Sequence, residues 1–158
     1  MTVVSNTTPL NYLVLIGRVE ILNALYEKVV IPQAVFAELT STRAPDKVRA
    51  WVTSKPNWLT VDKSPNVVDS ELDAIQIGER EAILLAEQIQ ADFIVLDDRK
   101  ARRIATDRGL NVIGTLGILT TGAEKGLITL RDALIDLRQT SFRVSDRLFE
   151  LLVQQDRE

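Results

Sequence analysis

The stretch Ala91-Asp-Phe-Ile-Val-Leu-Asp-Asp-Arg-Lys-Ala-Arg-Arg103 decides the fold. Its apolar run, Phe93 to Leu96, predicts a buried strand. Two carboxylates, Asp97 and Asp98, follow that strand directly. Open α/β sheets place ligands just outside the carboxyl ends of their strands. The acid pair therefore has two interpretations: one wall of a functional site, or a helix cap followed by solvated basic residues.

Strand-like and helix-like segments alternate along the chain on both sides of this stretch. Strands are predicted at residues 2–5, 29–31, 59–61, 93–96 and 111–113. Helices are predicted at residues 9–17, 19–26, 32–39, 47–53, 79–91, 100–108, 114–125, 129–138 and 144–155, with a helical turn at 71–77. In the first helix, Thr8 is expected to be the cap and Pro9 the first helical residue. Such alternation predicts an α/β protein with a mostly parallel sheet and helices on both faces.

The length and composition indicate one globular domain over residues 1–158. Its 158 residues, 46% apolar and 26% charged, suffice for a single sizeable core. No apolar run approaches the roughly 18 residues that a membrane span needs, and no secretory leader is apparent. Together with the absence of cysteine, this leads us to expect a cytoplasmic protein without a membrane partner.

The chain also has no histidine. This excludes nucleophilic machinery of the Ser-His-Asp and Cys-His types, and it disfavours zinc. Hydrolytic chemistry would then depend on carboxylates, hydroxyls, lysine or arginine, whose natural metal companions are Mg²⁺ and Mn²⁺. The net charge of −3 argues against general nucleic-acid binding but leaves room for a local basic patch.

Three further side chains are candidates for the same sheet edge. Asn6 follows the first strand, and its amide oxygen is either a metal ligand or part of a turn. Glu38 lies about 105° from the centre of the apolar face of its helix, so it either reaches a cleft or stays in water. Glu79 lies about 60° from the centre of the next helix's apolar face and Glu81 about 100°, which favours Glu79 for a site.

Convergence of these acids would imply a bound cation. Two carboxylates about 4 Å apart repel each other by about 4 kcal/mol at an effective dielectric constant near 20. A group of three or four would be unstable without a metal ion. The sequence alone does not show whether the acids converge.

Three segments resemble the PIN-domain family of metal-dependent ribonucleases, in the branch that includes VapC-like toxins. They are Val3-Val-Ser-Asn-Thr-Thr-Pro-Leu10, Gly78-Glu-Arg-Glu-Ala-Ile-Leu-Leu-Ala86 and Ile94-Val-Leu-Asp-Asp-Arg-Lys-Ala-Arg102. With Ile31-Pro-Gln-Ala-Val-Phe-Ala-Glu38 and Asn111-Val-Ile-Gly-Thr-Leu-Gly117, the similarity covers about residues 2–126. The remainder is predicted to be a helical C-terminal extension.

The resemblance implies a three-layer α/β/α sandwich with an acidic pocket at the carboxyl edge of the sheet. Glu38 matches the acid of the early helix and Glu79 that of the middle helix, with Glu81 as the alternative. Asp97 and Asp98 match the acids after the later strand, and the resemblance does not choose between them. These carboxylates are thus the expected catalytic groups and, with Asn6, the expected ligands of Mg²⁺ or Mn²⁺.

The chain departs from the family pattern at its first position. Most PIN nucleases have aspartate where this chain has Asn6, which keeps an oxygen ligand but removes a charge. Thr7 or Thr8 matches the small hydroxyl residue that often follows, and we expect Thr7 to contact substrate.

The leading hypothesis is therefore metal-assisted hydrolysis of RNA phosphodiester bonds. The basic residues expected to hold flanking phosphates are Arg99, Lys100, Arg102 and Arg103. The alternative is a catalytically weak or inactive PIN-fold binding module, which Asn6 and the acidic pI favour. A receiver-like phosphoacceptor is less favoured because its acid pair follows the first strand. A phosphate loop is less favoured still, because Gly114-Thr-Leu-Gly117 lacks the Gly-Lys-Ser/Thr ending.

Partners follow from the resemblance alone. It implies an RNA substrate, a small antitoxin protein whose segment covers the cleft, and a homodimer built from helices. The apolar faces of residues 10–16 and 19–25 are the candidate dimer surfaces, or else part of the core.

Overall fold

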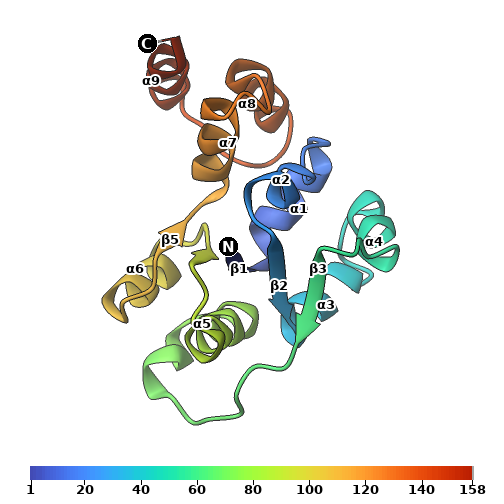
Figure 1. Cartoon of the computed structure of the whole chain (residues 1–158), viewed down its shortest axis with the longest axis vertical. Helices are drawn as coiled ribbons and strands as arrows, with labels where there is room; N and C mark the ends of the chain where they lie inside the picture. The colour runs from blue at the N-terminus through green and yellow to red at the C-terminus, as the bar shows by residue number, and fades with distance from the viewer. Residues whose placement is uncertain (158) are drawn as a thin grey trace.

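The fold is an α/β/α sandwich around a five-stranded parallel sheet. The computed structural model describes residues 1–157, with side chains to Asp156. The strands are β1 (Thr2–Ser5), β2 (Lys28–Pro32), β3 (Leu59–Asp62), β4 (Phe93–Val95) and β5 (Val112–Ile113). They lie in the order β3-β2-β1-β4-β5, and every adjacent pair is parallel (Figure 1). The predicted α/β class and its parallel sheet are confirmed.

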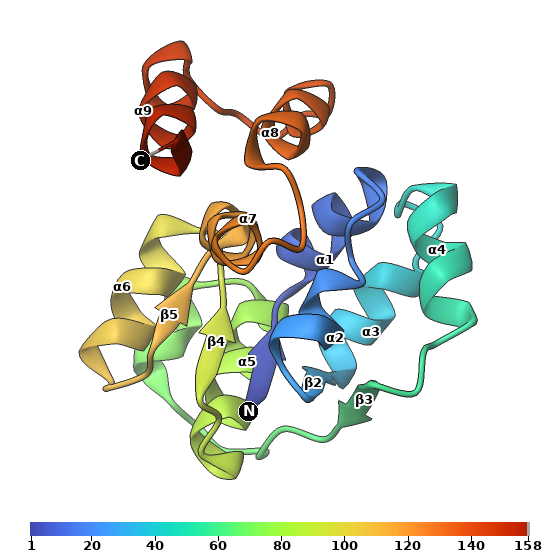
Figure 2. The ribbon, with the colours of Figure 1, turned by 45° about the horizontal axis from the view of Figure 1, so that its top comes forward.

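Helices connect the strands and extend the chain beyond the last one (Figure 2). They are α1 (Thr7–Leu15), α2 (Ile21–Leu25), α3 (Gln33–Thr40), α4 (Asp46–Thr53), the 3₁₀ turn η1 (Ser70–Ala74), α5 (Ile77–Ile89), α6 (Arg99–Asp107), α7 (Thr115–Glu124), α8 (Leu130–Arg138) and α9 (Asp146–Arg157). No helix among the described residues has both the length and the apolar character needed to cross a bilayer.

Alternating strand residues divide the core into two layers. Val3 and Val95 belong to the cluster that packs against α1, α2, α3 and the helices after residue 114. Val4 and Ile94 point to the opposite face and pack against α5 and α6. Successive side chains of a strand point to opposite faces, so each apolar strand run supplies both layers.

Two helices begin earlier than the sequence predicts. α1 begins at Thr7 with Asn6 at the cap position, so Thr8 is not the cap and Pro9 is the third helical residue. Proline fits there because the first four N–H groups of a helix have no intrahelical acceptor. α5 begins at Ile77, which makes Glu79 its third residue.

The two candidate dimer surfaces lie inside the protein. Leu10, Leu13 and Leu22 are at most 1% exposed and belong to the main hydrophobic cluster. The alternative interpretation, that these faces are core, is therefore correct. Both helices pack against α7, and α1 also packs against α3 and α4, so these faces are covered within one chain.

Candidate functional site

The carboxyl edge of the sheet brings together segments that are far apart in the sequence. Asn6 follows β1, α3 follows β2, Asp97 lies two residues beyond β4, and Gly114 follows β5. Because β2, β1, β4 and β5 are consecutive neighbours in a parallel sheet, all of these connections begin at the same edge. This is the position at which open α/β sheets bind ligands.

Asn6 and Glu38 meet at the start of α5, above Gly78. A Cβ atom placed on Gly78 would lie 2.3 Å from Glu38 Oε1 and 3.3 Å from Asn6 Oδ1. Glu38 Oε1 therefore approaches the backbone of Gly78 more closely than a larger residue would allow, and Asn6 Oδ1 would make a tight contact with such a residue. The structure thus brings together two predicted ligands from α3 and from the end of β1.

Glu79 is the buried acid of this group. Its side chain is 6% exposed, and its Oε1 accepts a hydrogen bond of 3.1 Å from the Gln76 backbone N–H. Burial raises the pKa of Glu79, the bond from Gln76 lowers it, and the charges of Asp98 and Glu38 raise it further. Glu38, Glu79 and Asp98 therefore share one electrostatic environment.

The adjacent acids Asp97 and Asp98 have different partners. Asp98 is the N-cap of α6 and accepts a bond of 3.0 Å from the Ala101 N–H. Asp97 accepts bonds from the Thr115 N–H at 2.8 Å and from Thr115 Oγ1 at 2.6 Å. The cap interpretation thus holds for Asp98, whose charge also acts on Glu79, whereas Asp97 is held at the start of α7.

Glu81 is bonded to the first turn of α3. One of its oxygens accepts a hydrogen bond of 3.1 Å from the Ala34 N–H in the first turn of α3. This satisfies a backbone donor that has no partner within its own helix. Of the two alternatives on α5, Glu79 is the one that lies with Glu38 and Asp98.

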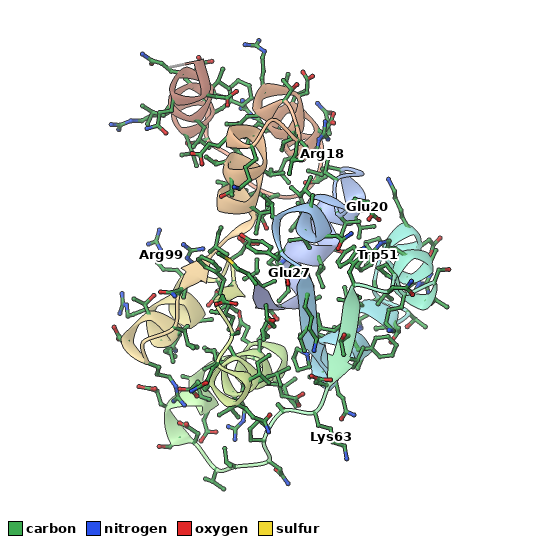
Figure 3. The ribbon with its side chains drawn as sticks, in the orientation of Figure 1. Arg18, Glu20, Glu27, Trp51, Lys63 and Arg99 are labelled. Atoms are coloured by element: carbon green, nitrogen blue, oxygen red, sulfur yellow. The ribbon has the colours of Figure 1, made fainter. Side chains whose placement is uncertain are left out.

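The predicted cations divide into two sets. Arg99, Arg102 and Arg103 line a cavity of about 390 Å³ together with Asp97. Arg102 Nη1 donates to the Leu96 carbonyl at 2.8 Å. Lys100 is exposed and does not line this cavity. Figure 3 labels Arg99, which lies at the side of the molecule between α6 and α7.

Thr7 and Glu38 line a larger cavity together with other residues of α3 and of the segment that follows it. It has a volume of about 750 Å³ and apolar walls from Ala37, Leu39 and Pro45. Within the described part of the chain, Thr7 Oγ1 is a buried oxygen without a hydrogen-bond partner. Buried hydroxyls are usually satisfied, so this oxygen is an exception.

The carboxylate and amide oxygens of this group suit a hard cation, although the carboxylates are separated from one another. Carboxylate and amide oxygens are the ligands that Mg²⁺ and Mn²⁺ prefer. Among residues 1–157, no ion pair includes Glu38, Glu79 or Asp98. In the same range no three carboxylates lie within metal-binding reach of one another. A cation would therefore fit these oxygens only by drawing them closer together.

Three structural residues of the site escaped sequence reasoning. Thr115 orients Asp97, Gly78 makes room for Asn6 and Glu38, and Gly114 lies beneath Arg102. The available signal was a hydroxyl residue directly after a predicted strand and a glycine, at the edge where an open α/β sheet places its ligands.

Comparison with known proteins agrees with this architecture. A family model described as a PIN domain matches residues 2–158. The matched range includes all five strands and extends through the helices that follow β5. No curated protein and no solved structure gave a significant match.

Proposed function

The chain belongs to the PIN-domain family, whose fold is of the nuclease type, and from this premise we propose that it is a metal-dependent ribonuclease. The observation that carries the proposal is the group Asn6, Glu38, Glu79 and Asp98 at the carboxyl edge of the sheet. Its oxygens include a buried carboxylate whose pKa is raised and which forms no ion pair within residues 1–157.

In this proposal Asn6, Glu38, Glu79 and Asp98 would hold Mg²⁺ or Mn²⁺. When bound, the metal would supply a nucleophilic water at neutral pH and neutralise charge on the phosphate. Asp97 lies in the turn between β4 and α6, and its bonds with Thr115 tie that turn to the start of α7. Arg99 and Arg102 lie beside Asp97, where they would bind the RNA phosphates next to the scissile bond.

The decisive experiment compares RNA cleavage by the wild type, Glu79→Gln and Asp98→Asn in Mn²⁺. We expect each variant to cleave at least about ten-fold more slowly, because each removes one anionic ligand. Asn caps a helix about as well as Asp, so Asp98→Asn should leave stability nearly unchanged. Glu81→Gln is the matched control and should cleave at the wild-type rate. Equal cleavage by all four proteins would point to a contaminating nuclease and contradict the assignment.

The second candidate is a PIN-fold binding module without catalysis. Asn6 favours it, because the amide contributes no charge to the metal site. Calorimetric titration with Mn²⁺ separates the two functions. Stoichiometric binding that Glu79→Gln abolishes supports the nuclease, whereas absence of binding by the wild type supports the module.

We propose further that the protein acts in the cytoplasm as the toxin of a toxin–antitoxin pair. The support is the likeness of its acid-bearing segments to VapC-like proteins. A small antitoxin protein would then cover the acid edge, which is the carboxyl edge of the sheet that carries Asn6, Glu38, Glu79 and Asp98. A second copy of the chain would form a homodimer. Finding a reading frame for a small antitoxin beside the gene would support this toxin–antitoxin proposal.

A further inference from the structure

A third cavity lies beside Asp97, at the end of the sheet edge formed by β5. Its volume is about 640 Å³, and its lining includes Asp97, Arg99, Arg102, Gly114, Phe142 and Arg143. These residues come from the turn after β4, from α6, from the β5–α7 connection and from the segment between α8 and α9. The cavity therefore joins the acid edge to the C-terminal part of the chain.

Positive charge dominates the lining. Arg99, Arg102 and Arg143 supply three guanidinium groups, and Asp97 is the only carboxylate among the lining residues. That carboxylate already accepts two hydrogen bonds from Thr115. Among residues 1–157, none of the three arginines belongs to an ion pair. On a chain of net charge −3, this concentration of cations favours an anionic ligand.

Phe142 is fixed at the wall of the cavity. Its ring packs edge-to-face against Tyr12 of α1, with the ring centroids 5.0 Å apart. The neighbouring Ser141 hydroxyl forms a hydrogen bond of 2.7 Å with the Tyr12 hydroxyl. These contacts hold Phe142 and Arg143 against the helix that follows Asn6. Aromatic rings next to arginines are the usual means of binding unpaired nucleotides.

Glycine keeps the floor of the cavity open. A Cβ atom on Gly114 would lie 2.5 Å from Arg102 Nη1 and 2.9 Å from Asp97 Oδ1. Without that atom, Arg102 and Asp97 can approach the backbone where α7 begins. The positive end of α7 is occupied by Asp97 through the Thr115 N–H. A phosphate here would therefore bind to the arginines and not to the helix end.

We propose that this cavity is a nucleotide subsite of the same RNA-binding edge. Arg99, Arg102 and Arg143 bind the phosphate of a nucleotide adjacent to the scissile bond, and the Phe142 ring contacts its base. The inference rests on the proposed ribonuclease function and goes beyond it, because it gives the segment between α8 and α9 a role in holding substrate. Contacts to phosphate and to a base face are tolerant of sequence.

The test measures binding of a fluorescently labelled, unstructured ten-nucleotide RNA by anisotropy in EDTA, where cleavage does not interfere. We expect Arg143→Gln to weaken binding at least about five-fold and to reduce the slope of log affinity against log salt by about 0.7, the value for one phosphate contact on a single strand. Phe142→Leu should weaken binding by a similar factor without changing the slope, because it removes stacking and no charge.

Arg131→Gln is the matched control, since Arg131 is exposed on α8 and does not line the cavity. It should bind RNA within about two-fold of the wild type, and far-UV circular dichroism should show all variants folded. Equal affinities and salt slopes for Arg143→Gln and Arg131→Gln would overturn the subsite.

The subsite and the ribonuclease can fail separately. Binding that depends on Arg143 but is not accompanied by Mn²⁺-dependent cleavage would support the subsite and contradict the nuclease. Cleavage that depends on Glu79, together with full RNA binding by Arg143→Gln, would support the nuclease and overturn the subsite.

Discussion

Glu79 places a carboxylate in a buried position that costs the metal-free protein stability. It is 6% exposed, and its pKa is raised by burial and, further, by the charges of Asp98 and Glu38. The Gln76 N–H offsets part of this cost by donating a hydrogen bond. A buried ionised group without a countercharge destabilises the native state. The same arrangement attracts a cation, so stability and metal affinity are opposed at this residue.

Replacing Glu79 by glutamine should therefore stabilise the metal-free protein. The folded-state pKa of Glu79 lies above its ordinary value, so the unfolded chain loses this proton first as the pH rises. The free-energy cost of ionising Glu79 in the native state grows as the pH rises from the unfolded-state pKa to the folded-state pKa, and it is complete above the folded-state pKa. The glutamine side chain keeps an oxygen for the Gln76 N–H but carries no charge. Urea denaturation in EDTA should show the variant to be more stable at about pH 7.5, with the difference shrinking as the pH falls toward about 4.

A metal titration and a control variant test the same buried charge. Mg²⁺ should raise the melting temperature of the wild type and leave that of Glu79→Gln unchanged, because ligand binding stabilises only a protein that binds it. Glu124→Gln, an exposed change on α7, serves as the control. If the free energy of unfolding depends on pH in the same way in Glu124→Gln and in Glu79→Gln, the buried charge of Glu79 is not the source of that dependence.

At the scale of elements, the first turn of α5 organises the acid edge. Gln76 precedes the helix, Gly78 is its second residue, and Glu79 is its third. Asn6 and Glu38 approach Gly78 from two other elements, whereas Glu79 extends from the turn itself. One helix end thereby fixes the positions of acids that are distant in sequence. Glycine is costly within helices, so its presence at this position is explained by the close approach of Glu38.

Gly78→Ala should weaken metal binding with little loss of stability. The new Cβ would lie 2.3 Å from Glu38 Oε1, so the Glu38 carboxylate must move away. Alanine is favoured over glycine in a helix by about 1 kcal/mol, which offsets part of the local strain. Calorimetry with Mn²⁺ should show an affinity at least about five-fold lower.

Gly122→Ala on α7 is the matched control for this change. Its Cβ would lie 3.5 Å from Ile21 Cδ1, an ordinary contact, so Mn²⁺ affinity should equal that of the wild type. An unchanged affinity in Gly78→Ala would mean that Glu38 does not contribute to the metal site.

At the scale of the whole molecule, the helices after β5 share the main core of the α/β sandwich. The buried cluster that contains Val3 and Leu13 also contains residues of α8 and α9. Those residues are Leu130, Ala133, Leu134, Leu137, Phe149 and Val153. Arg18 strengthens the connection by bonding to Asp136 of α8 at 2.6 Å. The segment that carries Phe142 and Arg143 is thus held by the same core as the acid edge.

Leu134→Ala should lower the free energy of unfolding of the entire chain by about 2–5 kcal/mol, because it leaves a cavity in this core. Leu134 is fully buried, whereas Leu151 on α9 is 48% exposed, so Leu151→Ala should cost much less. Urea unfolding followed by circular dichroism and by the fluorescence of Trp51 and Trp58 should give one shared transition. A loss of helix signal before the tryptophan signal would show that the C-terminal helices unfold separately.

Local patterns in the sequence were sufficient to predict the framework. Alternating strand and helix segments, together with apolar runs such as Phe93 to Leu96, predicted a parallel α/β sheet. The position of Asn6, Asp97 and Asp98 after strands placed them at one edge, because the carboxyl ends of parallel strands meet there. Helical periodicity favoured Glu79 over Glu81. These features depend on residues close together in the chain, which is why the sequence determines them by itself.

Only the tertiary structure decided where the individual side chains are directed. Asp97 differs from Asp98 because Thr115, 18 residues later, donates two hydrogen bonds to its carboxylate. Glu81 Oε1 likewise accepts a hydrogen bond from Ala34, 47 residues earlier. The apolar faces of α1 and α2 became core because both helices pack against α7, and α1 also packs against α3 and α4. Phe142 packs against Tyr12, and Phe142 and Arg143 line one cavity with Asp97 and the β5–α7 connection. Each of these outcomes depends on a partner distant in sequence, which no local pattern specifies.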